Sequence, residues 1–165
     1  MAHDFISNTP IAAVETVPAA QAHIAETSTP APSGRITASL VPENQRLQFL
    51  PRHLGRHMLL GEATVYGFMR RLCRNYDGGF WEFIELSNGG FYMRLRSALT
   101  MTIEVDMGND YSGTMSADAA SIVACLFTFS HLSCGGVGGL SEAYLLLLDF
   151  AAEHEECAEI LRAID

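Results

Sequence analysis

The fold is decided by the stretch Gly78–Leu95, GGFWEFIELSNGGFYMRL. It contains the only tryptophan of the chain, and two runs rich in aromatic and β-branched residues flank Ser87–Gly90. Asn-Gly between two such runs is the strongest short-range signal for a β-hairpin, because both residues accept a positive φ and the turn matches the twist of the strands. The sequence therefore predicts antiparallel strands at about residues 80–86 and 90–96.

Two more strands are predicted after the hairpin. Residues 100–106 alternate polar and apolar side chains, as a half-buried strand does. The turn residues Gly108-Asn109-Asp110 separate them from a short strand at residues 111–114.

Helices are predicted on both sides of these strands. Apolar residues at helical spacing predict a helix from residue 51 or 53 to residue 76, after an extended segment at 46–51. Ser116 is a good N-cap for a helix to about residue 133, and Ser141 for a second one to about residue 153. Both are strongly apolar, and a short last helix follows.

Strands in the middle and helices at both ends indicate an α+β fold, in which about four helices cover a small antiparallel sheet of three or four strands. Residues 1–45 are rich in Ala, Thr, Pro and Ser and lack periodicity. Such a segment buries too little apolar surface to offset the entropy lost on ordering. We predict a flexible N-terminal extension over residues 1–45, ordered in part near Leu40–Val41, and a single domain over residues 46–165.

Composition excludes several kinds of chemistry. All ten basic residues are arginine, so a P-loop lysine, a Schiff-base lysine and a kinase-type lysine are ruled out. The four cysteines form no CxxC pair and are predicted to be free thiols in a reducing compartment. No secretory signal is visible, and the longest apolar stretch, Ala119–Cys134, is too short to span a bilayer. These features predict a cytoplasmic protein without membrane contact.

Charge is unevenly distributed along the chain. Residues 46–96 carry eight arginines and four acids, whereas residues 97–165 carry eleven acids and one arginine. Opposite faces, or pairing of the two segments across the fold, would both explain this. A nucleic-acid surface is one alternative, built from Arg52, Arg56, Arg70, Arg71, Arg74, Tyr66, Tyr76 and Trp81. The net charge of −9 counts against it. A DNA mimic that uses Glu153, Glu155, Glu156 and Glu159 is a second, weaker alternative.

No catalytic or metal constellation can be assembled from spacing. His53 and His57 lie four apart but lack a third ligand, and the two HxxC units at residues 131–134 and 154–157 match no well-known zinc signature. Gly135–Gly139 lacks the GxGxxG spacing and is interpreted as a helix–helix connector. We therefore predict no cofactor, no metal and no enzymatic activity.

Several strings in the same order resemble the ArdB/KlcA family of antirestriction proteins. They are the hairpin above, RLQFLPRHLGRHMLLG at Arg46–Gly61, MSADAASIV at Met115–Val123 and RAID at Arg162–Asp165. Members are small proteins of plasmids and other mobile elements that relieve type I DNA restriction. The resemblance implies a non-catalytic inhibitor of a type I restriction–modification system, which acts directly or through a cellular factor, without direct DNA binding.

The residues expected to carry this function are exposed polar groups inside the family-like strings. Their expected roles are contact or conformational support: Arg52, Arg56, Tyr76, Trp81, Glu82, Glu85, Asn88 and Asp118. Trp81 could instead belong to the core, Asn88 could serve only the turn, and Asp118 could serve only as a helix-start carboxylate.

Overall fold

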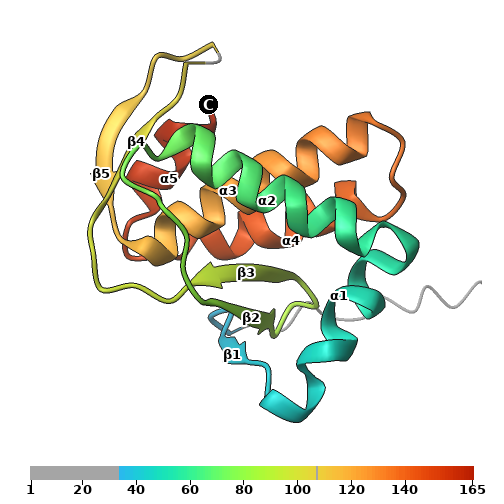
Figure 1. The fold of residues 1–165 in the computed structure, drawn as a ribbon. Coiled ribbons are helices and arrows are strands. Elements are labelled where there is room, and N and C mark those ends of the chain that lie inside the picture. Colours follow the sequence, from blue (N-terminus) through green and yellow to red (C-terminus); the bar gives the residue numbers. More distant parts are fainter. Residues whose placement is uncertain (1–33, 107) are drawn as a thin grey trace, which may run out of the picture. The chain divides into compact units, whose positions relative to one another are not determined.

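The computed structural model describes residues 34–106 and 108–165. Its helices and strands follow the chain in the order shown in Figure 1. The strands are β1 Ala38–Leu40, β2 Trp81–Leu86, β3 Phe91–Leu95, β4 Met101–Glu104 and β5 Ser112–Met115. The α-helices are α1 Arg46–Leu54, α2 Met58–Leu72, α3 Ala117–Cys134, α4 Leu140–Ala152 and α5 Cys157–Ile164, with 3-10 turns η1 Glu43–Gln45 and η2 Gly55–His57. The predicted α+β class is confirmed.

Strands β2 and β3 form the predicted hairpin, in the register that pairs Trp81 with Leu95 and Glu82 with Arg94. The turn differs from the expected one, because only Gly89 has a positive φ, of 91°. The Asn88 side chain instead accepts the Gly90 N–H at 3.0 Å and donates to the Leu146 carbonyl at 2.8 Å. Asn88 therefore fixes both the turn and its contact with α4.

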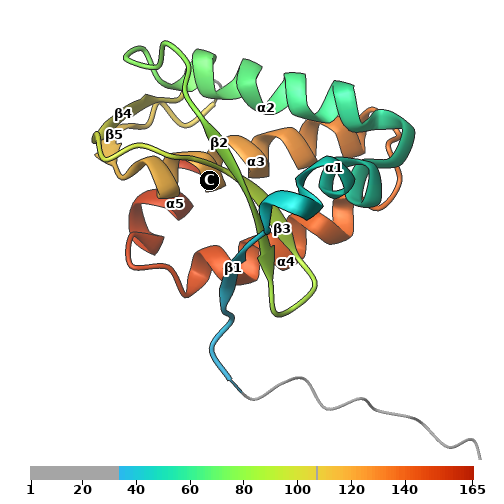
Figure 2. The ribbon, with the colours of Figure 1, turned by 60° about the horizontal axis from the view of Figure 1, so that its bottom comes forward.

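Helix α3 lies at the centre of the described fold. It contacts α2, α4, α5, β3 and β4, and Figure 2 shows it between α2 and α4. The predicted N-cap is confirmed, since the Ser116 hydroxyl accepts the Ala119 N–H at 3.1 Å. By length and composition α3 could cross a membrane, but 67 % of its residues are buried within the described fold. That burial is typical of a core helix.

Side chains of α3 close the free edge of β3. Ser121 Oγ accepts the Leu95 N–H at 2.9 Å, and Cys125 Sγ accepts the Met93 N–H at 3.4 Å. All four residues are buried. Because unpaired backbone N–H groups are costly away from water, these two side chains replace the hydrogen bonds of a further strand.

The strands fall into two sheets and not the single sheet predicted. One sheet has the order β1-β2-β3, and β4 pairs only with β5 within the sheets described. The edge of β3 is occupied by α3, so β4 cannot add there. A bridge between Cys73 and Ile103 joins the β4–β5 ribbon to the end of α2 instead.

Strand β1 belongs to the segment predicted as an extension. It pairs antiparallel with β2, with Ala38 opposite Leu86, and the Val41 N–H donates to the Phe83 carbonyl at 2.9 Å. The folded part therefore begins before the predicted boundary at residue 46. Residues 1–33 of the predicted extension lie outside the described residues.

The segment 46–51, predicted as extended, is helical. Phe49, Leu50 and Leu54 have helical spacing and are all buried, which favours α1 over an extended chain. Pro51 lies inside α1 and lacks the N–H that would bond to the Leu47 carbonyl, so the burial of these three side chains must offset that loss. The helix then stops at Gly55, which takes a φ of 51°, so one predicted helix becomes α1 and α2.

Two further helix limits differ from the prediction. Helix α2 ends at Leu72 and not at residue 76, because Cys73 is extended and makes its bridge to Ile103. Helix α4 begins after Gly139, whose φ is 82°, and Ser141 does not cap it. The Ser141 hydroxyl is instead 2.5 Å from that of Ser133, across the predicted glycine-rich connector.

Aromatic stacking joins α1 to the sheet. Phe49 stacks on Phe83 with ring centroids 4.6 Å apart, and the His53 ring stacks on Phe91 at 4.0 Å. His53 Nε2 is 3.3 Å from Glu85 Oε1, but Arg52 pairs with the same carboxylate. Burial, with the nearby Arg52 charge, lowers the pKa of His53 from 6.5 to about 4. The ring is therefore neutral at physiological pH.

We predict that Ser121→Ala lowers the free energy of unfolding by about 1–3 kcal/mol, because it leaves the buried Leu95 N–H without an acceptor. Urea unfolding at neutral pH measures the effect. Ser130→Ala is the matched control, since Ser130 is an exposed serine of the same helix. Equal stabilities of the two variants would show that α3 does not close the edge of β3.

A second prediction concerns acid stability. The pKa of His53 is about 4 in the folded protein, and its ordinary value is 6.5. Between pH 6.5 and 4 the unfolded chain therefore binds a proton at His53 and the folded protein does not. The contribution of His53 to stability is thus fully present above about pH 6.5 and is lost as the pH falls toward 4. His53→Gln should reduce the dependence of the free energy of unfolding on pH in this range. His131→Gln, at an exposed histidine, should leave that dependence unchanged. A ring titration midpoint near 6.5 in NMR would contradict the buried neutral imidazole.

Candidate functional site

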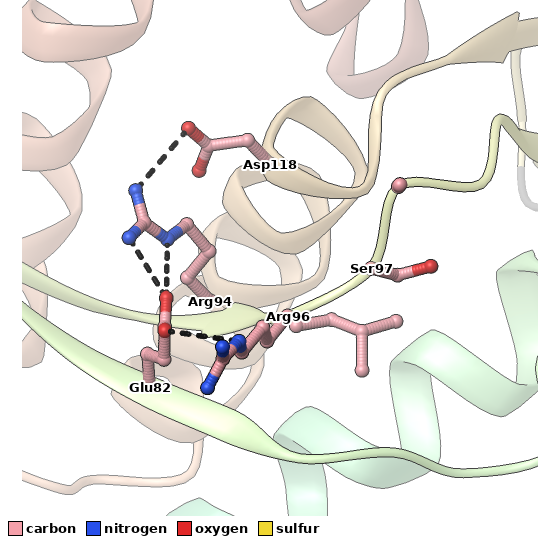
Figure 3. A pocket seen from close by; sticks show the side chains of 7 residues that line it. Glu82, Arg94, Arg96, Ser97 and Asp118 are labelled. Atoms are coloured by element: carbon pink, nitrogen blue, oxygen red, sulfur yellow. Dashed lines mark hydrogen bonds and ion pairs between the residues drawn. The ribbon is translucent and has the colours of Figure 1, made fainter.

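An open hollow of about 530 Å³ lies where β2, β3 and the start of α3 meet. Figure 3 shows the guanidinium of Arg94 between the carboxylates of Glu82 and Asp118. Arg94 donates from Nε and Nη2 to Glu82 Oε2 at 3.0 and 2.8 Å, and its Nη1 is 3.9 Å from Asp118 Oδ2. Glu82 is only 13 % exposed, so this is a half-buried charged network and not a surface ion pair.

Asp118 is held from two other sides. It accepts the Tyr92 hydroxyl at 2.9 Å, and His154 Nε2 lies 3.9 Å from its Oδ2. Burial alone would raise the pKa of Asp118, but the interactions with His154, Tyr92 and Arg94 outweigh it and hold the pKa below its ordinary value. A carboxylate with a lowered pKa is a weak base at neutral pH, so Asp118 is suited to binding rather than to proton transfer.

The same geometry shifts the pKa values of the partners of Asp118. Burial and the Asp118 carboxylate raise the pKa of Tyr92, which stays a neutral hydrogen-bond donor. Burial alone would lower the pKa of Arg94, but Glu82 and Asp118 raise it. The network therefore keeps fixed charges over the physiological pH range.

The helix face that closes the β3 edge also positions Asp118. Asp118, Ser121 and Cys125 are spaced three and four residues apart, and such residues share one face of a helix. The hydrogen bonds of Ser121 and Cys125 to β3 fix the helix against the strand. Asp118 is thereby brought to Arg94, which belongs to that strand.

The predicted site residues separate into several groups. Glu82 and Asp118 lie together at the hollow, and Arg52 and Glu85 form an ion pair on the face of the sheet next to α1. Glu82 and Glu85 make these contacts with different elements, as expected for residues three apart on a strand. Asn88 holds the hairpin turn on α4.

Trp81 belongs to the interior, Tyr76 is half-buried against the core, and Arg56 lies apart from both. Trp81 is 5 % exposed and donates from Nε1 to the Tyr76 hydroxyl at 3.1 Å, so both serve packing. Arg56 is exposed and donates to the neighbouring His57 at 3.0 Å. The alternative role considered for Trp81, a core position, is the one in which the structure places it.

The histidines considered as metal ligands do not converge. His57 accepts from Arg56, His131 packs edge-on against Phe68, and His154 faces Asp118. In the described part of the chain, no group of three or more His, Cys, Asp or Glu side chains is placed to hold a metal ion.

The arginines of the alternative nucleic-acid surface are partly paired with acids. Arg52 pairs with Glu85, Arg71 with Asp106 at 3.2 Å and Arg74 with Glu104 at 2.6 Å. The acidic cluster near the C-terminus is engaged as well. Glu153 accepts the Ile36 N–H at 2.8 Å, Glu156 accepts from Ser116, and Glu159 pairs with Arg162 at 2.5 Å. Three ion pairs therefore join the basic and acidic segments across the fold: Arg71–Asp106, Arg74–Glu104 and Arg94–Asp118.

Sequence reasoning missed Arg94, Tyr92 and His154. The hairpin itself carried a signal for the first, because residues 82 and 94 are equally distant from Asn88 and must face each other across the turn. No such signal existed for His154, which reaches Asp118 from the segment after α4.

Comparison with known proteins identifies the family. The family model described as "Antirestriction protein" matches residues 74–165. Antirestriction protein KlcA of Escherichia coli is 49 % identical over 136 residues, which cover 79 % of this chain and 95 % of KlcA. The uncharacterized protein YafX of Escherichia coli K12 is 36 % identical over 147 residues, 81 % of this chain and 91 % of YafX.

A solved structure has the same fold. It comes from work on the KlcA and ArdB proteins that reports a novel fold and antirestriction activity against type I DNA restriction systems in vivo but not in vitro. The TM-score is 0.73 at 49 % identity, over 79 % of this chain and 95 % of the solved one. Sequence and fold agree, and the chain belongs to the ArdB/KlcA-type family of antirestriction proteins.

Proposed function

We propose that this protein relieves restriction of incoming DNA by a type I restriction–modification system in the bacterial cytoplasm. The observation that carries the proposal is the match to KlcA, at 49 % identity over 95 % of its length, together with the shared fold. We place the activity in the α+β domain predicted at residues 46–165, to which β1 adds a strand.

The proposed mode is non-catalytic inhibition. The charged hollow holds carboxylates and a guanidinium that already bind one another, and Asp118 is a weak base there. Such fixed charges suit recognition of a surface. The work on KlcA and ArdB reports activity in vivo but not in vitro, which favours action through a cellular factor over direct inhibition of the isolated restriction complex.

Neither alternative gains support from the geometry. Direct binding of DNA needs arginines free to release counterions from phosphates, and three of the five candidates are engaged with acids. A DNA mimic needs regularly spaced free carboxylates, and Glu153, Glu156 and Glu159 are engaged in hydrogen bonds or ion pairs.

We predict that expression of the chain raises the plating efficiency of unmodified phage on a host with an active type I system to near that on a restriction-deficient host. Expression from an inducible promoter should give graded protection that disappears once the protein is diluted out, because an inhibitor acts only while it is bound. Phage already carrying the host modification is the control and should plate equally with and without the protein.

Two results would contradict the proposal. Restriction that stays at full strength at high expression would reject the antirestriction function. A salt-sensitive mobility shift of duplex DNA with the purified protein would favour nucleic-acid binding over the proposed mode.

A further inference from the structure

The rim of the charged hollow carries an arginine without a close partner. Arg96 follows β3 directly, and its side chain is 73 % exposed. Its Nε is 3.9 Å from Glu82 Oε1, beyond hydrogen-bond length, whereas Arg94 binds the other oxygen of the same carboxylate, Oε2. A guanidinium has five N–H donors in a fixed fork, so Arg96 keeps donors available for a further acceptor (Figure 3).

The backbone around Arg96 is held in place. The Arg96 N–H donates to the Phe80 carbonyl at 2.8 Å, and the Leu99 N–H donates to Ser97 Oγ at 3.1 Å. The Thr100 carbonyl accepts from the Asn75 side chain at 3.3 Å. These bonds fix the segment that presents Leu99, whose side chain is 70 % exposed. Ordering this segment on binding would therefore cost little entropy.

Arginine is enriched at protein–protein hot spots. Leu99 directly follows Ala98, which lines the hollow, and so adds an exposed apolar side chain at its rim. Arg94 and Arg96 balance Glu82 and Asp118 in charge, so the hollow has no net attraction for a run of phosphates. The net charge of the whole chain, −9, also disfavours nucleic acid. A protein surface can match both signs, with a carboxylate for Arg96 and a donor for Asp118.

We propose that this hollow and its rim are the docking surface for a protein partner, and that Arg96 binds a carboxylate of that partner while Leu99 packs against it. The docking surface is defined by Glu82, Arg94, Arg96, Leu99 and Asp118. The proposal rests on the proposed antirestriction function and adds where on the molecule the partner binds and what its surface must offer.

The test is the phage-plating assay with single variants of the full chain. Arg96→Glu should lower protection about tenfold or more, as the loss of an interface hot spot does, and Leu99→Ser should lower it as well. Both side chains are exposed, so expression level and urea unfolding midpoint should stay those of the unchanged protein. Arg70→Glu is the matched control, since Arg70 is an exposed arginine on α2 that makes no ion pair among the described residues, and it should retain protection.

The outcomes separate the two proposals. No protection by the unchanged protein would overturn the proposed function and this surface with it. Protection by the unchanged protein that either Arg96→Glu or Leu99→Ser retains in full would overturn only the docking surface. An equal loss in Arg70→Glu and Arg96→Glu would also overturn it, because it would show a general need for positive charge, as nucleic-acid binding requires.

Discussion

The fold depends on how the free edge of β3 is satisfied. A strand edge carries N–H and C=O groups that must find partners when they are buried. Here the partners are the side chains of Ser121 and Cys125 on α3, not another strand. A hydroxyl can accept from a strand and still donate within its own helix, and Ser121 does both, with its donation to the Ala117 carbonyl at 2.6 Å. Helix and strand are thereby joined by hydrogen bonds as well as by apolar packing.

The division of the strands and the position of the polar hollow both follow from that contact. With one edge of the sheet taken by α3, β1 pairs at the other edge, and β4 and β5 form a ribbon of their own. The α3 face that binds β3 continues toward the N-terminus of the helix to Asp118, which meets Arg94 and Tyr92 of the same strand. The contact between α3 and β3 thus also positions the charged hollow, and a change in that contact would displace the hollow.

Much of the local structure could be predicted because it depends on near neighbours in the chain. The Asn-Gly turn, the alternation of residues 100–106 and the Ser116 cap are such features, and each lies where the sequence places it. The errors arose where distant contacts outweighed local signals. Cys73 leaves the helix to bridge Ile103, and the segment from residue 46 is helical because Phe49 reaches Phe83. Of the predicted site residues, Glu82 and Asp118 line the same hollow, whereas Trp81 is part of the core.

The sequence by itself determined the α+β class, the hairpin, the apolar central helix and the family, because each depends on the order and spacing of residues along the chain. Only the tertiary structure decided which charges meet. Arg94, Asp118 and His154 come from three separate segments, and ion pairs are set by distance in space rather than along the chain. The same reason explains why an exposed Arg96 beside an occupied Glu82 could be recognised only in three dimensions.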